Sequence, residues 1–273
     1  SAKVLAYVIG SRTDSTKDGL YLREMATGNV RTVLSGPGNY RNFAFDRRQQ
    51  QFVFSSDRDE FGKDSAQSVV YLGSVRTGSA TPVIRKDMLP AGLRLGNNGS
   101  ASFNRNATAL TVNLQTPPIE TVPDDSLAGK ANFDLWHWKD PQLQPQQKLQ
   151  LNGARTRSYQ AVYHIATKKL VQLATDSVPS VSLSDDGTRG MALSSVPYQI
   201  ERMWLNEGSD LYVVDPVNAN RTLLRKKVSG TAQISFGGKY LLFFDKRSWY
   251  SYNFATRKDT NITGGLKDVR FRQ

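Results

Sequence analysis

The sequence lacks cysteine altogether and holds only two histidines among its 273 residues. Without cysteine, disulfide bonds and zinc sites built from thiolates are excluded. No apolar run approaches the ~20 residues that a membrane-spanning helix needs, so we expect no membrane partner. Hydrophobic residues still make up 38% of the chain, which is ordinary for a globular protein that buries a core.

The clearest pattern is a four-strand unit at residues 230–263. Apolar and aromatic residues fall into four short segments separated by polar turns, and Gly237 and Gly238 supply the positive φ that a tight hairpin needs. The expected strands are Ala232–Ser235, Tyr240–Asp245, Trp249–Phe254 and Asp259–Thr263. One small antiparallel sheet cannot cover both of its faces alone, so this unit needs neighbours of its own kind.

Parts of this unit recur along the chain. Tyr21 and Tyr71 lie 50 residues apart in equivalent hairpins, and Tyr163 and Tyr212 lie 49 apart. A period of about 40–50 residues with four strands per period predicts an all-β fold, a β-propeller of four-stranded antiparallel blades with about five blades represented. The segments lack the 3.6-residue periodicity of helical repeats. We interpret residues 1–273 as one propeller domain.

Blades can be assigned in chain order. Residues 3–34 predict three strands, residues 40–85 a full blade, and a third blade begins at 100–103 and 109–114. The acidic loop after residue 55 holds Asp57, Asp59 and Glu60, which are possible calcium ligands. The loop lacks the ligand and glycine spacing of an EF-hand, so a solvated loop is the favoured interpretation.

An insertion interrupts the third blade. Tyr71 and Tyr163 lie 92 residues apart, and the excess over one period falls at residues 115–158. Alternation over 133–138 predicts a strand with Trp136 and Trp138 on one face, and we expect at least one of these tryptophans to be buried. A short helix is expected over 142–151. Long loops in compact domains are usually functional or disordered, and two tryptophans argue against disorder.

Three stretches of the chain carry a family resemblance. They are DLWHWKDPQLQPQQ, YQAVYHIATKKLVQLA and VSLSDDGTRGMAL. The first two resemble the N-terminal propeller of bacterial prolyl oligopeptidase family serine peptidases of the dipeptidyl peptidase IV-like and acylaminoacyl peptidase-like kinds. The third is similar to repeats that these propellers share with TolB-like propellers. The resemblance implies a parent propeller of seven or eight blades, a periplasmic or secreted bacterial location rather than a cytoplasmic one, and a peptide substrate.

The resemblance also implies an α/β-hydrolase domain in the same polypeptide as the main partner of this chain. The G-x-S-x-G turn of such a domain is missing from these 273 residues. Neither His137 nor His164 has a nucleophile nearby in the sequence. We therefore expect no catalytic residue, cofactor or metal in this chain, and any chemistry would lie beyond Gln273.

The resemblance implies that the propeller gates substrate access and docks on the hydrolase domain. Trp136, Trp138 and Asp140 in the insertion are the first candidates for this role. Glu201 and Trp204, in a second projecting loop, are the others. The paired glutamates with which some relatives hold a substrate amino terminus have no counterpart here.

Two other functions remain open from the sequence. A free-standing TolB-like propeller would serve as a protein-interaction module. The net charge of +12, of which +9 falls in residues 221–273, would suit a polyanion. The basic residues in question include Arg225, Lys227, Lys246 and Arg257. A solvated or docking face is the favoured interpretation, and we do not expect nucleic acid as a partner.

Two arrangements of the chain ends are possible. In one, a strand at 268–272 pairs with residues 3–9 and completes a ring of five blades. In the other, the ends are cut points in a larger propeller, which is the arrangement that we favour because the resemblance supplies a larger parent.

Overall fold

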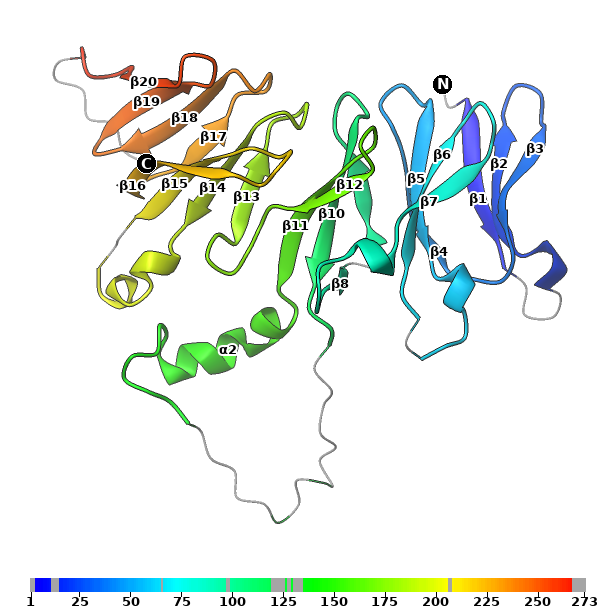
Figure 1. The fold of residues 1–273 in the computed structure, drawn as a ribbon, viewed down its shortest axis with the longest axis horizontal. Coiled ribbons are helices and arrows are strands. Elements are labelled where there is room, and N and C mark those ends of the chain that lie inside the picture. Colours follow the sequence, from blue (N-terminus) through cyan, green and yellow to red (C-terminus); the bar gives the residue numbers. More distant parts are fainter. Residues whose placement is uncertain are drawn as a thin grey trace.

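The computed structural model describes residues 3–10, 15–64, 66–96, 99–118, 126, 129, 135–205 and 208–266. Within these residues the strands form five antiparallel sheets in chain order (Figure 1). The prediction of an all-β, propeller-like fold is confirmed by this topology. Most strands pair with the next strand in the sequence across a polar turn, and the third sheet departs from this pattern because β8 and β9 both pair with β10.

The sheets are named by their order along the chain. The first holds β1 (Val4–Ile9), β2 (Gly19–Glu24) and β3 (Val30–Ser35). The second holds β4 (Tyr40–Phe45), β5 (Gln51–Ser56), β6 (Val69–Ser74) and β7 (Ala80–Ile84). The third holds β8 (Arg94–Leu95), β9 (Ala101–Phe103), β10 (Ala109–Gln115), β11 (Ser158–His164) and β12 (Lys169–Gln172). The fourth holds β13 (Ser180–Leu183), β14 (Gly190–Ser194), β15 (Ser209–Val214) and β16 (Arg221–Val228). The fifth holds β17 (Ala232–Ile234), β18 (Tyr240–Asp245), β19 (Ser248–Asn253) and β20 (Lys258–Asn261).

Helical segments are few and short among the described residues. The only α-helix of several turns there is α2 (Gln144–Arg155). The 3₁₀ turns are η1 (Ser15–Lys17), η2 (Arg58–Glu60), η3 (Lys86–Met88), η5 (Val196–Tyr198) and η6 (Glu201–Met203). Within the described part of the chain, no helix has both the length and the apolar character that crossing a bilayer requires.

The predicted strands of the last unit agree with the structure to within two residues at every end. The turn between β18 and β19 is tighter than expected, since Asp245 already pairs with Ser248. Its two central residues, Lys246 and Arg247, have φ of 48° and 65°. A two-residue hairpin turn whose twist matches that of the strands requires positive φ at both central residues. Here two non-glycine residues adopt this conformation.

In the third sheet the first strand is divided. Both β8 and β9 pair with the same edge of β10, at Leu114 and at Leu110 respectively. The predicted three strands at 3–34 and full blade at 40–85 are both found.

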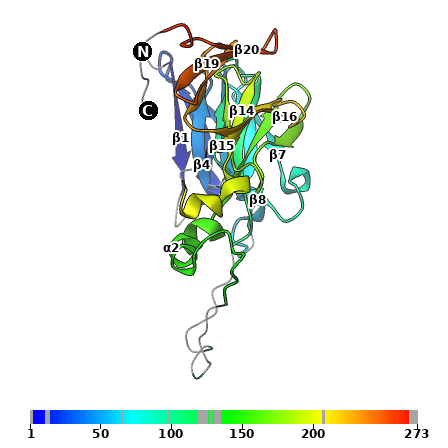
Figure 2. The ribbon, with the colours of Figure 1, turned by 90° about the vertical axis from the view of Figure 1, so that its left-hand side faces the viewer.

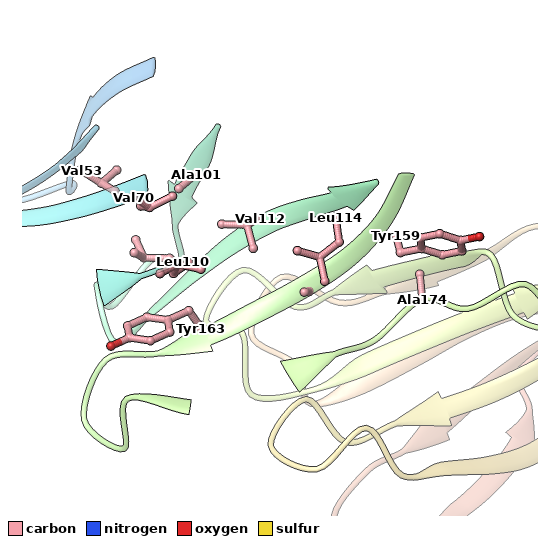
Figure 3. Close-up of a cluster of buried hydrophobic side chains, with 11 residues drawn as sticks. Val53, Val70, Ala101, Leu110, Val112, Leu114, Tyr159, Tyr163 and Ala174 are labelled. Carbon is pink, nitrogen blue, oxygen red and sulfur yellow. The ribbon is translucent and has the colours of Figure 1, made fainter. Parts of the chain in front are cut away.

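Alternate residues of each strand pack on different neighbours. In β14, Ala192 packs toward the third sheet, whereas Met191 packs toward the fifth. Four buried clusters result, one between each pair of consecutive sheets. Figure 3 shows the cluster that joins the second and third sheets, with Val53 and Val70 facing Leu110. The sheets therefore stack face to face in the order of the sequence.

The stack forms a row whose first and last sheets lie at opposite ends of the longest axis (Figure 1). All strand pairings of the described residues fall within the five sheets, and none joins the first sheet to the fifth. The strand expected at 268–272 lies outside the described residues, so the pairing that would complete a five-bladed ring stays a prediction.

Removing a buried ring between two sheets should destabilise the fold. Phe243 of β18 is completely buried against the fourth sheet. Phe243→Ala should lower the free energy of unfolding by about 3–5 kcal/mol, because both transfer and cavity terms are lost. Phe61→Ala is the matched control, since Phe61 is 50% exposed. Chemical denaturation of both variants measures the difference, and equal costs would contradict the stacked arrangement.

Candidate functional site

Two segments depart from the repeat at the same edge of two neighbouring sheets, the third and the fourth. The first, the insertion arm (residues 135–157), precedes β11 and contains α2. The second, the 195–205 loop, follows β14 and contains η5 and η6. Both lie below the sheets in two perpendicular views (Figures 1 and 2). All five candidate residues from the sequence fall on these two segments.

The arm begins with a tight turn around Asp140. Its carboxylate oxygen Oδ2 accepts the His137 backbone N–H at 2.9 Å and the Gln147 side-chain amide at 3.3 Å. The Asp140 N–H in turn donates to the His137 carbonyl. The hydrogen bond from the His137 N–H, followed by that from Gln147, lowers the pKa of Asp140. Asp140 therefore acts as a structural acceptor that links the turn to α2.

Helix α2 begins with Pro145 in its first turn, where a missing N–H costs nothing. It ends at Thr156, whose N–H and hydroxyl both bond to the Asn152 carbonyl. None of the described helical residues is buried. Leu149 and Leu151 are the two leucines of the helix, which is too few for a continuous apolar stripe. A recess of about 560 Å³ lies along this helix.

The base of the arm is fixed to the third sheet. The Asp176 carboxylate accepts the Tyr159 hydroxyl and the Arg157 guanidinium, each at 2.7 Å. The Tyr159 hydrogen bond, followed by that from Arg157, lowers the pKa of Asp176. Gln115 at the end of β10 adds a bond to the Thr156 carbonyl. The arm is thus held where it leaves the sheet.

The 195–205 loop is held by a buried carboxylate. Asp210 accepts the Tyr198 hydroxyl at 2.6 Å and the Lys227 backbone N–H at 3.2 Å. Donation to Asp210 is the main cause that raises the pKa of Tyr198 to about 12, with burial next. The Lys227 ammonium lies over the Tyr198 ring and pairs with Glu201 at 2.8 Å. Glu201 therefore fixes the loop to β16.

Both segments carry large exposed apolar side chains. The indoles of Trp136, Trp138 and Trp204 are 59%, 77% and 66% exposed, and Leu149 is 86% exposed. Sequence reasoning identified the tryptophans as candidates but missed the exposed aliphatic residues. The sequence feature that could have indicated them is the presence of isolated leucines in an otherwise polar helix. We name the exposed apolar surface by its members: Leu135, Trp136, Trp138, Leu143, Leu149, Leu151, Ile200, Trp204 and Leu205.

The prediction of a strand at 133–138 is wrong for its described part. Residues 133 and 134 lie outside the described residues, and Leu135–Trp138 form no strand. The expected burial of Trp136 or Trp138 is also wrong, since both are exposed. The local bonds of Asp140 and His137 close a turn here, and the Lys139 N–H donates to the His137 ring. The short helix is found, shifted to Gln144–Arg155.

The carboxylates of the acidic loop after residue 55, for which a solvated loop is favoured over a calcium site, have hydrogen-bond partners within the protein. Asp57 accepts two bonds from Asn39, Asp59 accepts the Tyr71 hydroxyl, and Glu60 accepts the Gln67 N–H. They line a recess of about 450 Å³ together with Arg85, Lys86 and Asp87. Among the described residues, no group of three or more potential ligands could hold a metal ion.

Part of the basic C-terminal region is engaged within the fold. The Arg225 guanidinium pairs with Asp259 and lies over the rings of Phe243 and Tyr250. Lys227 is occupied by Glu201. These two cations therefore stabilise the fourth and fifth sheets, and they add little to a field that would attract a polyanion.

Comparison with solved structures finds likenesses of low identity. TolB from Acinetobacter baumannii is 14% identical with a TM-score of 0.38, over 95% of this chain and 52% of TolB. The acylaminoacyl peptidase of Pyrococcus horikoshii is 14% identical with a TM-score of 0.41, over 97% of this chain and 38% of the peptidase. The β-propeller domain of the trilobed protease from Pyrococcus furiosus is 10% identical with a TM-score of 0.42, over 97% of this chain and 70% of that domain.

The structural neighbours thus include both kinds of protein that the sequence resembles, TolB and peptidases with propeller domains. The chain spans about half of TolB and less than half of the acylaminoacyl peptidase. No protein-family description and no curated protein matches the chain.

Truncating the exposed tryptophans should leave stability unchanged. Trp136→Ala and Trp138→Ala remove side chains that are mostly in water, so we expect changes in the free energy of unfolding within about 0.5 kcal/mol. Thermal unfolding measures the change in stability of both variants, with Phe243→Ala as a destabilised reference. A cost near that of the reference would show that the arm is packed in solution.

The Tyr198–Asp210 hydrogen bond should make stability depend on alkaline pH. The pKa of Tyr198 is raised in the folded chain from 10.0 to about 12, so its contribution is complete below pH 10 and is lost as the pH rises to about 12. Tyr198→Phe should lower stability at neutral pH by about 1 kcal/mol and flatten this decline.

The matched control is Tyr21→Phe, because the hydroxyl of Tyr21 donates to the Lys17 carbonyl and not to a carboxylate. Tyr71, with its pKa also raised to about 12 by burial and by Asp59, keeps part of the alkaline decline in both variants. Unfolding curves between pH 9 and 12 compare the three proteins. An unchanged slope in Tyr198→Phe would contradict the assignment.

Proposed function

We propose that this chain is the non-catalytic propeller of a serine peptidase, which docks on an α/β-hydrolase domain of the same polypeptide and gates the access of peptide substrates. The observation that carries the proposal is the exposed apolar surface, which includes three tryptophans on two segments that extend from the same edge of the third and fourth sheets. The sequence resemblance in WHWKDP and the neighbouring tyrosine hairpin supports the same assignment.

The chemistry of the surface favours docking over catalysis. Large exposed apolar patches mark interaction sites, and tryptophans commonly dominate the binding energy of interfaces. Asp140 and Glu201 are both engaged, the first by His137 and Gln147 and the second by Lys227. Their part in the proposed function is to hold Trp138 and Trp204 in place for a partner.

The anchoring pattern supports a gating role. Each segment is fixed at its base, the arm by Asp176 and the loop by Asp210, while the tryptophans stand in solvent. A surface that is fixed in position but exposed at its tip can cover an opening in a neighbouring domain. We further propose a periplasmic or secreted location for the parent protein.

The coding sequence after residue 273 provides the decisive test. About 250 further residues with G-x-S-x-G, followed by an aspartate and a histidine, would support the peptidase assignment. A gene without such a segment would contradict it, and would leave the free-standing TolB-like interaction module as the function.

A variant of the parent peptidase would test the role of the surface. Trp136→Ala, Trp138→Ala and Trp204→Ala together should lower kcat/KM for peptides by about tenfold or more, because docking energy and gating are lost together. Phe61→Ala, at an exposed phenylalanine elsewhere in the chain, is the control. Unchanged kinetics in the triple variant, with the thermal midpoint also unchanged, would contradict the proposed role.

A further inference from the structure

The interface between the fourth and fifth sheets opens into a recess at one edge. Val213 of β15 and Tyr252 of β19 pack together within this interface. Both also line a recess of about 310 Å³, whose other walls include polar side chains. The recess lies where β14 begins and β15 ends, whereas the 195–205 loop follows the other end of β14. It is therefore separate from the exposed apolar surface.

The same place can be identified in the preceding interface, between the third and fourth sheets. The inner turn of the third sheet closes at Ala109, and that of the fourth sheet closes at Arg189, each through its backbone carbonyl. These two residues therefore correspond. Ala109 pairs with His164 of β11, and the residue at the corresponding place beside Arg189 is Asp215, one step beyond the pairs of β14 with β15.

The preceding interface is closed at this place. Ala109 is buried between the third and fourth sheets. The His164 ring donates from Nε2 to the Pro216 carbonyl of the fourth sheet at 3.0 Å. In the next interface Arg189 and Asp215 take these two positions, and both line the recess. The opening therefore follows from these two residues and not from the repeat itself.

Two arginines give the recess a cationic character. Arg189 belongs to the fourth sheet, and Arg257 lies in the turn between β19 and β20 of the fifth. In the described part of the chain, neither is paired with a carboxylate. Asp215 is the acid among the described lining residues, and its Oδ1 accepts the Val217 N–H at 3.0 Å. Cations therefore exceed anions along the described lining.

The remaining walls combine apolar and neutral polar groups. The rings of Tyr252 and Phe254 meet edge-on, with centroids 5.4 Å apart, and Val213 packs in the same cluster. Asn220 and Thr222 add an amide and a hydroxyl. The volume of about 310 Å³ is at the lower limit of small-molecule sites, which range from about 300 to 1,000 Å³. A suitable ligand is small, anionic at one end and apolar at the other.

We propose that this recess binds an organic carboxylate that carries an apolar side group. Arginine binds carboxylates through paired N–H donors, and Arg189 and Arg257 supply such donors from the two sheets that form the walls. Tyr252 and Phe254 contact the side group. The C terminus of a peptide and a free small acid both have this chemistry. The recess and the exposed apolar surface lie at opposite ends of β14, so binding here is independent of the proposed docking.

Titration of the chain with N-acetylphenylalanine, followed by NMR, tests the proposal. The wild type should bind it at millimolar concentrations, because both arginines are exposed and their charges are screened by solvent. N-acetylphenylalanine amide lacks the charge, and acetate lacks the ring. Each should bind at least about tenfold more weakly than N-acetylphenylalanine.

Two variants assign the binding to the recess. Arg189→Gln and Arg257→Gln each remove one guanidinium and should weaken the binding of N-acetylphenylalanine by about tenfold or more. Both side chains are exposed, so the fold should be kept, and circular dichroism checks this. The matched control is Arg47→Gln, at an exposed arginine on the inner turn of the second sheet, which should bind as the wild type does.

A tetrapeptide that ends in phenylalanine distinguishes the two sources of the carboxylate. Competition with N-acetylphenylalanine would assign the recess to a peptide C terminus, and its absence would assign the recess to a free acid. Four results would overturn the proposal: no binding of N-acetylphenylalanine, equally strong binding of the amide or of acetate, full binding by either recess variant, or loss of binding in Arg47→Gln.

Discussion

Face-to-face packing of consecutive sheets is the interaction on which the rest of the structure depends. A strand sends successive side chains to opposite faces, so a sheet within the row needs cover on both sides. Close packing also restricts side-chain size within a sheet. Gly73 of β6 pairs with Phe52 of β5, and a Cβ atom at Gly73 would lie 2.2 Å from that ring, so even alanine would force the ring to move. Cover by the neighbouring sheets and the fit within each sheet together restrict composition, and the repeat in the sequence follows from the repeat in the packing.

This dependence explains how much of the fold could be predicted from the sequence. Leu241 and Phe243 are completely buried because their face packs on the fourth sheet, whereas Leu242 between them is more exposed, and the hairpins that hold such residues recur at a regular spacing. The divided first strand of the third sheet was not predictable, because β8 has two residues and joins the sheet only through β10. A two-residue strand leaves no periodicity to detect.

The sequence named the candidate residues but did not predict the conformation of the segment that carries Trp136 and Trp138. Trp136 and Trp138 alternate as strand residues do, yet no strand in the described part of the chain pairs with Leu135–Trp138. Local hydrogen bonds between Asp140 and His137 close a turn instead, and such bonds compete with a ladder wherever one is not provided. Alternation alone indicates a strand only where the repeat supplies a partner. The exposure of Leu149 could not be predicted for a similar reason, because an isolated leucine in the sequence does not indicate whether another element covers it.

The tyrosine–aspartate pairs have a consequence for how this architecture can change. Tyr71 with Asp59, Tyr159 with Asp176 and Tyr198 with Asp210 each tie a connecting segment to its sheet. Because these bonds lie near the points where segments leave the strands, the residues farther out contribute little to the fold. Those outer residues are free to be lengthened, shortened or exchanged while the sheets keep their register. The same scaffold can therefore acquire a new specificity by substitution at loop tips alone.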